Sequence, residues 1–577
     1  MAGLRGSGGR KDSSMQSKQS TAANTGVVNP ARIRIIFICF AILVVAVFAR
    51  LVWLTAIVGP ENAQKSEATK TVDVEVQAKR GTIYDRDGNV LACNVEAKTI
   101  YCNPTEVKDA AGAAAQLAAV LDGERSDYMD ALTAEDTSFA YIYQKADVDL
   151  AEKVKALNLD GIYFLDDTKR IYPNGSIGAQ IVGVCDTDGN GLTVLELYYN
   201  DILTGTNGVL VQQRGANGQP IAGGLKEKTE PTDGQDIVIS VDLEMQEYLE
   251  NRLAQAVTDI QGDGGNAIIY DASNGEILAM SSNPLMDPND RSTFDDNNMG
   301  LTSITTGFEP GSIFKTVTFT AAFEELDLDP DDDELFCPAQ LPANEYYVSD
   351  SHARGDVVYS LRDVLAQSSN VGTSLLASQL GFEELYDKIV KYNLTDYTGV
   401  DYPGESPGYL SDQKDWTDIQ AYNVSFGQGI MVTPLQLTRF YGALINDGVE
   451  CTPHFLLAKP QTGEEPVYQT EKVIENTEAI APVTSMLQSV VAYGTGTDAQ
   501  IAEFEPAGKT GTAEIVGEDG LYLLDTNNII FVGYLPESNS NLVCFVGVTN
   551  VPGDRITTPA FADIMSFAIN HYEISPE

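Results

Sequence analysis

Glu309-Pro-Gly-Ser-Ile-Phe-Lys315 is the stretch that decides how the second half of this chain folds and what chemistry it can perform. Its proline and glycine set a turn, and Ser312 opens an apolar helix that we expect to run through 316–326. Residues three apart share one helical face with Cβ atoms ~5–6 Å apart, so the Lys315 amine can come within reach of the Ser312 hydroxyl. A serine needs such a base to become nucleophilic, and an amine can serve once burial lowers its pKa.

Alone, the pattern is weak, because Ser-x-x-Lys also occurs at Ser411-Asp-Gln-Lys414, in a polar stretch that we interpret as a solvated turn. Either copy by itself is typical of a helix cap with an exposed lysine. Only Ser312 is followed by both Ser368-Ser-Asn370 and Lys509-Thr-Gly511. An ordinary turn is the alternative for the first of these partners, and a phosphate loop for the second. The phosphate loop fails because Glu503 stands where it needs a glycine.

Ser-x-x-Lys, Ser-x-Asn and Lys-Thr-Gly in this order are the signature of the penicillin-recognising serine acyltransferases. Further segments resemble class B penicillin-binding proteins: RGTIYDRDGNVLA at 80–92, GLTVLELYYNDILTG at 191–205, GQGIMVTPLQL at 427–437 and AGKTGTAE at 507–514. The resemblance covers most of residues 30–550. It implies an α+β fold in which a penicillin-binding transpeptidase domain, an antiparallel sheet flanked by helices, follows an elongated N-terminal pedestal domain and one transmembrane helix.

The resemblance also implies a role for each catalytic residue. Ser312 would attack the penultimate D-alanyl carbonyl of a peptidoglycan stem peptide and expel the terminal D-alanine, while Lys315 takes the hydroxyl proton. Ser368 would relay a proton towards the leaving amine, and Asn370 would hold the substrate amide. Lys509 would supply positive charge. Which group is the base remains disputed among relatives.

Substrate binding is expected on the strand that carries Lys-Thr-Gly. The resemblance implies Thr510, Gly511 and Thr512 as substrate-binding residues, with the two hydroxyls donating hydrogen bonds to the terminal carboxylate. The backbone N–H groups of Ser312 and Thr512 would form the oxyanion hole, where losing one donor typically costs on the order of 10²–10³ in rate. No metal or cofactor is implied.

An apolar segment, IIFICFAILVVAVFARLVWLTAIV at 35–58, precedes these motifs. Its 24 residues make about 36 Å of helix, enough to cross the ~30 Å hydrocarbon layer, and Arg50 lies near the far end, where it can snorkel. The basic residues come before it, so we expect a single-pass cell-membrane protein with a cytoplasmic N-terminus and an extracytoplasmic catalytic domain. A cleaved signal peptide and a buried core helix are the alternatives, and no clear cleavage site follows Val58.

Four parts are expected along the chain: a basic cytoplasmic tail at 1–34, the anchor at 35–58, a pedestal or dimerisation-type domain at 59–235 and the transpeptidase domain at 236–577. A polar stretch rich in Gly, Lys, Glu and Thr at 223–235 marks the last border. Alternation of apolar residues, turn residues and helical periodicity predict the elements inside these parts. They are a strand at 71–77, a hairpin at 80–94, helices across 109–157 and at 191–203, a strand at 236–241, a helix at 243–260, a hairpin at 266–280, strands at 528–535 and 541–548, and a helix at 559–572.

Composition excludes several classes of protein. The 577 residues hold 36 Lys plus Arg against 83 Asp plus Glu, a net charge of −47 that would repel nucleic-acid phosphates. A bifunctional class A synthase would have a glycosyltransferase motif with a histidine, but the first histidine here is His352, and neither it nor His454 or His571 has the context of a catalytic triad. A class A β-lactamase would need a glutamate where Val154 stands. The pairing of the following cysteines stays open: Cys93, Cys102, Cys185, Cys337, Cys451 and Cys544.

The sequence therefore favours a membrane-anchored peptidoglycan D,D-transpeptidase that cross-links stem peptides through a Ser312 acyl-enzyme, binds penicillin covalently and acts in septal wall synthesis. An elongation or sporulation transpeptidase and a D,D-carboxypeptidase are the enzymatic alternatives. A β-lactam sensor or inactive scaffold is the alternative that is not an enzyme. The partners implied are peptidoglycan stem peptides or lipid II, β-lactam antibiotics, and a membrane glycosyltransferase of the SEDS class with division proteins.

Overall fold

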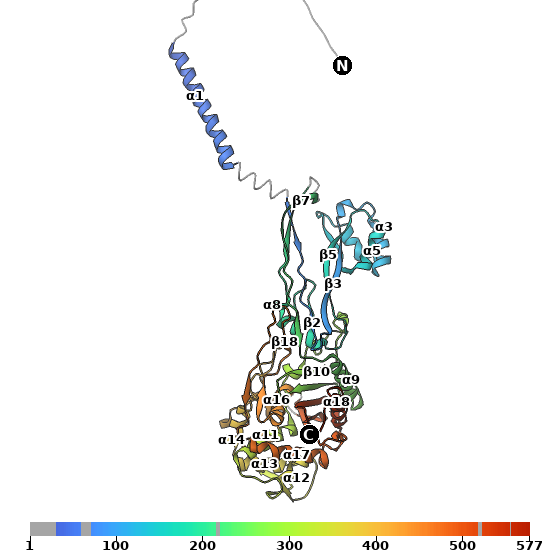
Figure 1. The fold of residues 1–577 in the computed structure, drawn as a ribbon, viewed down its shortest axis with the longest axis vertical. Helices are drawn as coiled ribbons and strands as arrows, with labels where there is room; N and C mark the ends of the chain where they lie inside the picture. The colour runs from blue at the N-terminus through green and yellow to red at the C-terminus, as the bar shows by residue number, and fades with distance from the viewer. Residues whose placement is uncertain (1–29, 59–70, 215–219, 517–521, 554, 577) are drawn as a thin grey trace, which may run out of the picture. The chain divides into compact units, whose positions relative to one another are not determined.

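The computed structural model divides the described residues into two compact units (Figure 1). One unit comprises the chain up to Val74 together with Val209–Lys228, and the other comprises Glu75–Gly208 together with Thr229–Glu577. The described residues are 30–58, 71–214, 220–516, 522–553 and 555–576.

The first unit contains the apolar helix. Helix α1 (Pro30–Trp53) continues as a π-helical turn, Leu54–Val58. Within it, Ile33–Val58 has a mean hydropathy of 3.0 and is not buried against other parts of the protein. Among the described residues this is the one helix long and apolar enough to cross a bilayer, and it contains the segment expected as the anchor. The strands β1 (Thr71–Val76), β6 (Gly208–Arg214) and β7 (Pro220–Thr229) form a three-stranded sheet in the order β1-β6-β7.

In the second unit, the pedestal part is built on the long strand β3 (Val90–Cys102), which pairs with β4 (Ala140–Asp147) and β5 (Ile162–Ile171). The helices expected across 109–157 are interrupted, because β4 divides α3 (Ala110–Leu121) and α4 (Arg125–Leu132) from α5 (Val148–Ala156). The β4 sequence alternates aromatic and other residues, a strand pattern that the surrounding alanines conceal. The prediction of helices is confirmed for α3, α4 and α5 and was wrong at β4.

The single helix expected at 191–203 is also divided, into α7 (Val194–Tyr198) and α8 (Asn200–Leu203). In a continuous helix, the carbonyl of Glu196 would accept a hydrogen bond from the N–H four residues later. Here it accepts one from Nη2 of Arg80 at 2.7 Å instead. The helix is therefore interrupted where a distant arginine takes over one of its carbonyl groups.

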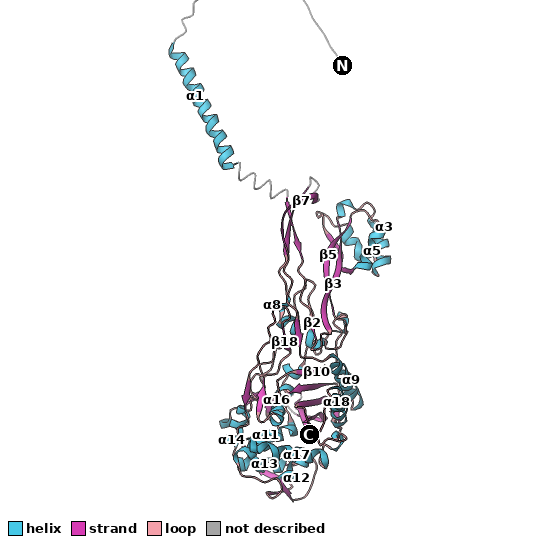
Figure 2. Cartoon of the chain, in the orientation of Figure 1, coloured by secondary structure: helices cyan, strands magenta, loops and turns pink. Residues whose placement is uncertain are grey.

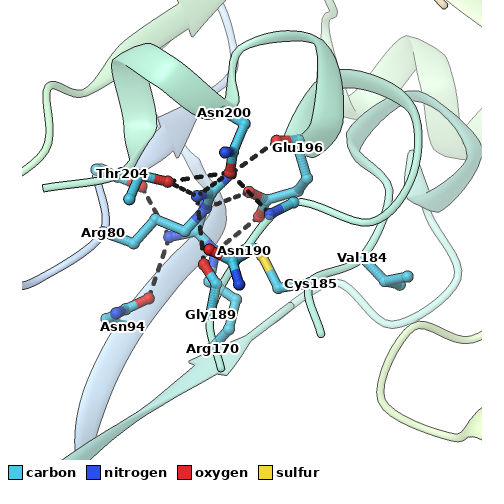
Figure 3. A network of polar contacts seen from close by, with 12 residues as sticks. Arg80, Asn94, Arg170, Val184, Cys185, Gly189, Asn190, Glu196, Asn200 and Thr204 are labelled. Carbon is cyan, nitrogen blue, oxygen red and sulfur yellow. Dashed lines mark hydrogen bonds and ion pairs between the residues drawn. The ribbon is translucent and has the colours of Figure 1, made fainter. Parts of the chain in front are cut away.

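That arginine belongs to a buried ion-pair network shown in Figure 3. Arg80 Nε lies 2.6 Å from one carboxylate oxygen of Glu196, and Arg170 Nε lies 2.7 Å from the other. The three side chains are 4%, 7% and 0% exposed for Arg80, Arg170 and Glu196, respectively. The segments 80–92 and 191–205, which carry part of the family resemblance, thus meet in a structural tie, because a buried charge of this kind requires its partners.

The transpeptidase part contains a five-stranded antiparallel sheet in the order β10-β9-β22-β21-β20 (Figure 2). Its strands are β9 (Gly264–Asp271), β10 (Ile277–Asn283), β20 (Ala507–Val516), β21 (Tyr522–Tyr534) and β22 (Leu542–Pro552). The hairpin expected at 266–280 and the two strands expected at 528–535 and 541–548 are confirmed. Strands from the two ends of this part thus pair in one sheet.

Helices cover both faces of that sheet. The helices α9 (Leu243–Asp259) and α18 (Thr558–His571) pack on one face, against side chains such as Ile269 and Phe531. The opposite face, with Ile268 among its side chains, packs against a core that includes residues of α11 (Lys315–Glu325), α16 (Pro434–Ile445) and α17 (Ile480–Ala492). Adjacent residues of a strand point to opposite faces, so both faces of this sheet are buried.

The remaining elements are short. The helices and 3₁₀ turns are η2 (Pro104–Glu106), α6 (Ala179–Val182), η3 (Arg291–Thr293), α10 (Thr302–Thr305), η4 (Gly311–Phe314), α12 (Leu361–Ala366), α13 (Asn370–Leu380), α14 (Phe382–Lys391), η5 (Gln413–Asp415), α15 (Asp418–Ser425), η6 (Thr477–Ala479) and η7 (Thr497–Ala499). The strands are β2 (Ile83–Tyr84), β8 (Ile237–Ile239), β11 (Glu334–Cys337), β12 (Leu341–Ala343), β13 (Tyr346–Val348), β14 (Val357–Ser360), β15 (Tyr409–Leu410), β16 (Ile430–Met431), β17 (Val449–Cys451), β18 (Leu456–Ala458) and β19 (Thr470–Lys472).

Candidate active site

The expected nucleophile lies in a short 3₁₀ turn, η4, immediately before α11. The sequence predicted that Ser312 opens the helix itself, whereas the α-helix begins at Lys315. A 3₁₀ turn aligns residues three apart even more closely than an α-helix does, so Ser312 and Lys315 still share one face. Gly311 has a φ of +56°, and a Cβ atom there would lie 2.7 Å from the carbonyl oxygen of Thr512. The glycine therefore lets η4 approach strand β20.

Lys315 is fully buried, and its amine is held by Ser368. The Nζ atom lies 2.5 Å from the Ser368 carbonyl oxygen and 3.1 Å from its Oγ. Among the described residues, Lys315 makes no hydrogen bond to Ser312. The structure thus brings the amine to the Ser-x-Asn serine, and its proximity to the nucleophile follows from the shared face of the turn.

Lys509 reaches the same serine from the opposite side. It is fully buried on β20, and its Nζ atom lies 3.0 Å from Ser368 Oγ and 3.0 Å from the Thr510 carbonyl oxygen. Lysines from a helix and from a strand, 194 positions apart in the chain, therefore share one hydroxyl group. That hydroxyl can pass a proton between the two amines.

Burial makes both amines unusually acidic. Removal from water lowers the pKa of Lys315 to about 7, against the opposing influence of the Asp350 carboxylate. The pKa of Lys509 also falls well below its usual value, first through burial and then through repulsion from Lys315. An unprotonated amine is therefore available at neutral pH, as a general base requires.

The Ser-x-Asn segment forms a tight turn between α12 and α13. Ser368 has a φ of +58°, and the next residue, Ser369, caps α13 by accepting a hydrogen bond from the N–H of Gly372 at 3.0 Å. Asn370 is the first residue of α13, and its Nδ2 donates to the carbonyl oxygen of Ser349 at 3.1 Å. The backbone turn thus points Ser368 towards the lysines while an outer loop orients the Asn370 amide.

Asp350 is a residue of the site that motif reasoning missed. It accepts hydrogen bonds from Ser369 Oγ and from the N–H of Val371, each at 3.0 Å, and pairs with Arg354 Nε at 2.6 Å. The carboxylate therefore holds the Ser-x-Asn turn from outside and places a negative charge near Lys315. No spacing rule relates it to the motif, so only its contacts identify it.

Thr510, Gly511 and Thr512 lie on β20, the edge strand of the sheet. Their inner neighbours on β21 include Ile529, the pairing partner of Thr512. A Cβ atom at Gly511 would lie 2.8 Å from Cγ2 of Ile313, so the strand passes directly beside η4. An edge strand presents unpaired N–H groups on its free side. The two expected oxyanion donors, at Ser312 and Thr512, belong to these adjoining segments.

The second Ser-x-x-Lys is the solvated turn that its composition predicted. Lys414 is 73% exposed and pairs with Asp412. Ser411 Oγ accepts a hydrogen bond from Gln420 Nε2 at 2.7 Å. It forms a hydrogen bond with neither the Ser-x-Asn motif nor the Lys-Thr-Gly motif in the described part of the chain. This second Ser-x-x-Lys is therefore not part of the candidate active site.

The histidines and cysteines have other surroundings. His454 stacks on Tyr468, and His571 lies 2.7 Å from Asp242, the N-cap of α9. All seven cysteines lie in the described part of the chain, and each is a free thiol there. The pairing that the sequence left open does not occur in this structure.

Comparison with known proteins places these features in a family. Residues 265–566 match the family model described as the penicillin binding protein transpeptidase domain, and residues 75–239 match the penicillin-binding protein dimerisation domain. The stage V sporulation protein D of Bacillus subtilis is 29% identical over 94% of this chain and 86% of its own length. The peptidoglycan D,D-transpeptidase FtsI of Buchnera aphidicola is 28% identical over 92% of this chain and 93% of its own length.

A solved structure agrees with both. Penicillin binding protein 3 of Mycobacterium tuberculosis, in complex with aztreonam, superimposes with a TM-score of 0.68 at 27% identity, covering 87% of this chain and 98% of that one. The transpeptidase model alone spans more than half of the present sequence. With its dimerisation domain preceding a serine transpeptidase domain, this chain belongs to the class B penicillin-binding proteins.

Proposed function

We propose that the protein is a membrane-anchored peptidoglycan D,D-transpeptidase that works through an acyl-enzyme on Ser312. The Ser312 hydroxyl would attack the penultimate D-alanyl carbonyl of a stem peptide while the neutral Lys315 amine accepts its proton. The backbone N–H groups of Ser312 and Thr512 would stabilise the oxyanion that forms. Collapse of this intermediate breaks the peptide bond and releases D-alanine, with Ser368 passing a proton to the leaving amine.

The terminal carboxylate of the donor peptide would bind beside Lys509, accepting hydrogen bonds from Thr510 and Thr512. In the free protein, burial disfavours a charge on Lys509. A bound carboxylate reverses this, since an opposite charge nearby favours the ammonium form. Asn370 would hold the amide of the donor, which would lie along β20 beside Gly511. An amine from a second stem peptide then attacks the ester, forming the cross-link and freeing Ser312.

One observation carries this proposal: the fully buried Lys315 and Lys509 share the hydroxyl of Ser368. Lys315 also lies one turn after Ser312, on the same face of that turn. A structural role does not explain this arrangement, because burying two amines without a carboxylate partner for each is costly. A lysine-based acyl transfer requires it, because the base must be neutral.

A fluorescent penicillin tests the covalent step on the full chain in detergent. We expect one adduct by intact mass spectrometry, located on Ser312 and lost in Ser312→Ala. The matched control is Ser411→Ala, which removes the serine of the second Ser-x-x-Lys and should label as the wild type does. An adduct that survives Ser312→Ala would refute the assignment.

A second assay distinguishes the enzymatic alternatives. With a stem-peptide donor and a free amine acceptor, a transpeptidase forms the cross-linked product, whereas a D,D-carboxypeptidase only releases D-alanine to water. A β-lactam sensor or inactive scaffold would form the penicillin adduct but neither product. We expect cross-linked product that depends on Ser312.

We also propose that this transpeptidase serves septal wall synthesis, in line with the FtsI relative, together with a SEDS-class glycosyltransferase and division proteins. A sporulation role is the second candidate, favoured by the likeness to stage V sporulation protein D. A fluorescent fusion at midcell in growing cells supports the septal role. Localisation only during spore formation would support the other role, and a sidewall signal would favour elongation.

For membrane topology, we propose the four parts 1–34, 35–58, 59–235 and 236–577, with the N-terminus in the cytoplasm and the remainder outside. The basic tail and the apolar helix Ile33–Val58 support this orientation. Protease added to intact spheroplasts should digest the catalytic part and leave a tag at the N-terminus protected. Digestion of the tag would show the opposite orientation.

A further inference from the structure

The turn Tyr493-Gly-Thr-Gly496 follows α17 and carries none of the three family motifs, yet it contacts Thr510 of the Lys-Thr-Gly motif. We propose that Thr495 is a positioning residue for the carboxylate subsite, acting through Thr510. The inference rests on the proposed function, which gives Thr510 the task of donating to the donor's terminal carboxylate. It adds a residue, outside the motifs, that controls how well that donation is made.

The contact is between two hydroxyl groups. Thr495 Oγ1 and Thr510 Oγ1 lie 2.5 Å apart, and either can donate. Thr510 Oγ1 also lies 3.3 Å from Lys509 Nζ. When this amine is protonated it has no lone pair, so it donates hydrogen bonds and accepts none. Whenever Lys509 is charged, the Thr510 proton has to go to another acceptor, and Thr495 Oγ1 is in place to receive it.

A bound carboxylate changes the direction of this bond. A carboxylate only accepts, so Thr510 must turn its proton towards the ligand. Thr495 can then donate its own proton to Thr510 Oγ1, and a hydroxyl that accepts a hydrogen bond becomes a stronger donor. Because this contact can be made in either direction, Thr495 holds the Thr510 oxygen at one position before binding and donates to it once the carboxylate is bound.

The backbone of the turn gives Thr495 a fixed place. Its N–H donates to the carbonyl oxygen of Ala366 at 3.1 Å, at the end of α12 and two residues before Ser368. A Cβ atom at Gly494 would lie 2.3 Å from that same oxygen, so the glycine permits the approach. Thr495 thus connects the end of α12, which leads into Ser368, to strand β20, which carries Lys509 and Thr510.

Three variants of the full chain in detergent test the proposal. Thr495→Val removes the hydroxyl at nearly constant shape, and Thr495→Ser keeps it. Thr497→Val is the matched control at another exposed threonine, the first residue of η7. The substrates are a thioester donor that ends in a free carboxylate and the same donor ending in a carboxamide, with acylation of Ser312 followed by mass spectrometry.

We expect Thr495→Val to lower kcat/KM for the carboxylate donor about two- to tenfold, mainly through KM, as for the loss of one hydrogen bond. The carboxamide donor should be unaffected, Thr495→Ser should restore the rate, and Thr497→Val should match the wild type. In a Thr510→Val background, the Thr495→Val change should have no further effect, because it acts through that hydroxyl.

Three results would overturn the inference. Equal losses on both donors would show that Thr495 supports the fold of the turn rather than carboxylate binding. Normal kinetics in Thr495→Val, with the wild type acylated at Ser312, would overturn this inference alone. Absence of acylation in the wild type would overturn the proposed function and this inference with it, so the two failures are distinguishable.

Discussion

The pH dependence of acylation follows from the burial of Lys315. An ordinary lysine with a pKa of 10.5 is neutral in only ~3 of 10⁴ molecules at pH 7. With the pKa lowered to about 7, roughly half of the Lys315 amines are neutral at that pH. Burial therefore supplies on the order of 10³-fold more of the basic form than an exposed lysine would.

The direction in which the acylation rate changes with pH follows from the protonation state of Lys315 that reacts. In the proposed mechanism the neutral amine is the base, so the second-order rate constant of acylation by a penicillin should rise about tenfold per pH unit below pH 6 and level off above about pH 8. Stopped-flow or gel-based measurement with a fluorescent penicillin across pH 5 to 9 gives the profile. Intact protein at each pH is checked by circular dichroism.

A substitution moves the midpoint in a stated direction. The Asp350 carboxylate raises the pKa of Lys315, so Asp350→Asn should shift the profile to lower pH. Asparagine keeps an oxygen that can accept from Ser369. A flat profile between pH 5.5 and 8.5, or an inflection near pH 10, would refute the assignment of neutral Lys315 as the base.

Three further results are expected elsewhere in the molecule. Glu196→Ala leaves two buried arginines without their carboxylate and should lower the unfolding free energy by about 3–5 kcal/mol in thermal melts, whereas Asp563→Ala, at an exposed ion pair, should cost under ~1 kcal/mol. Burial raises the pKa of Glu250 from 4.5 to about 7, so its protonation stabilises the fold fully below about pH 4.5, and this contribution is lost as the pH rises to about 7. Glu250→Gln should therefore remove the fall in melting temperature between pH 4.5 and about pH 7. Gly311→Ala should slow penicillin labelling at least tenfold, because its Cβ would lie 2.7 Å from the Thr512 carbonyl oxygen; unchanged labelling would show that η4 can move away from β20.

The motifs were predictable because each depends on residues that are close together in the sequence. The Ser312 and Lys315 pair depends on a spacing of three residues, and the hairpin at 266–280 on alternation around a turn. Four strands of the five-stranded sheet were predictable for the same reason, since β9, β10, β21 and β22 each have an apolar pattern of their own. The fifth strand, β20, was expected only from the family resemblance. The order of Ser-x-x-Lys, Ser-x-Asn and Lys-Thr-Gly then indicated one family.

The errors have a common physical cause. Strand β4 lies among alanine-rich helices, and its aromatic residues become a strand because β3 offers them a pairing edge. The helix at 191–203 divides because Arg80, more than 100 positions earlier, takes a carbonyl group from it. Both outcomes depend on a partner distant in the chain, which local periodicity does not contain.

The sequence by itself determined which residue types are available and which short segments they occupy: a serine and a lysine on one face, a Ser-x-Asn turn, and a Lys-Thr-Gly strand. Tertiary structure alone decided that Lys315 and Lys509 meet at Ser368. It also decided that Asp350 contacts Ser369 and that Thr495 contacts Thr510, each from a segment without a motif. The reason is that desolvation and hydrogen bonding act through space. A lysine loses its proton near pH 7 only when residues far along the chain close around it.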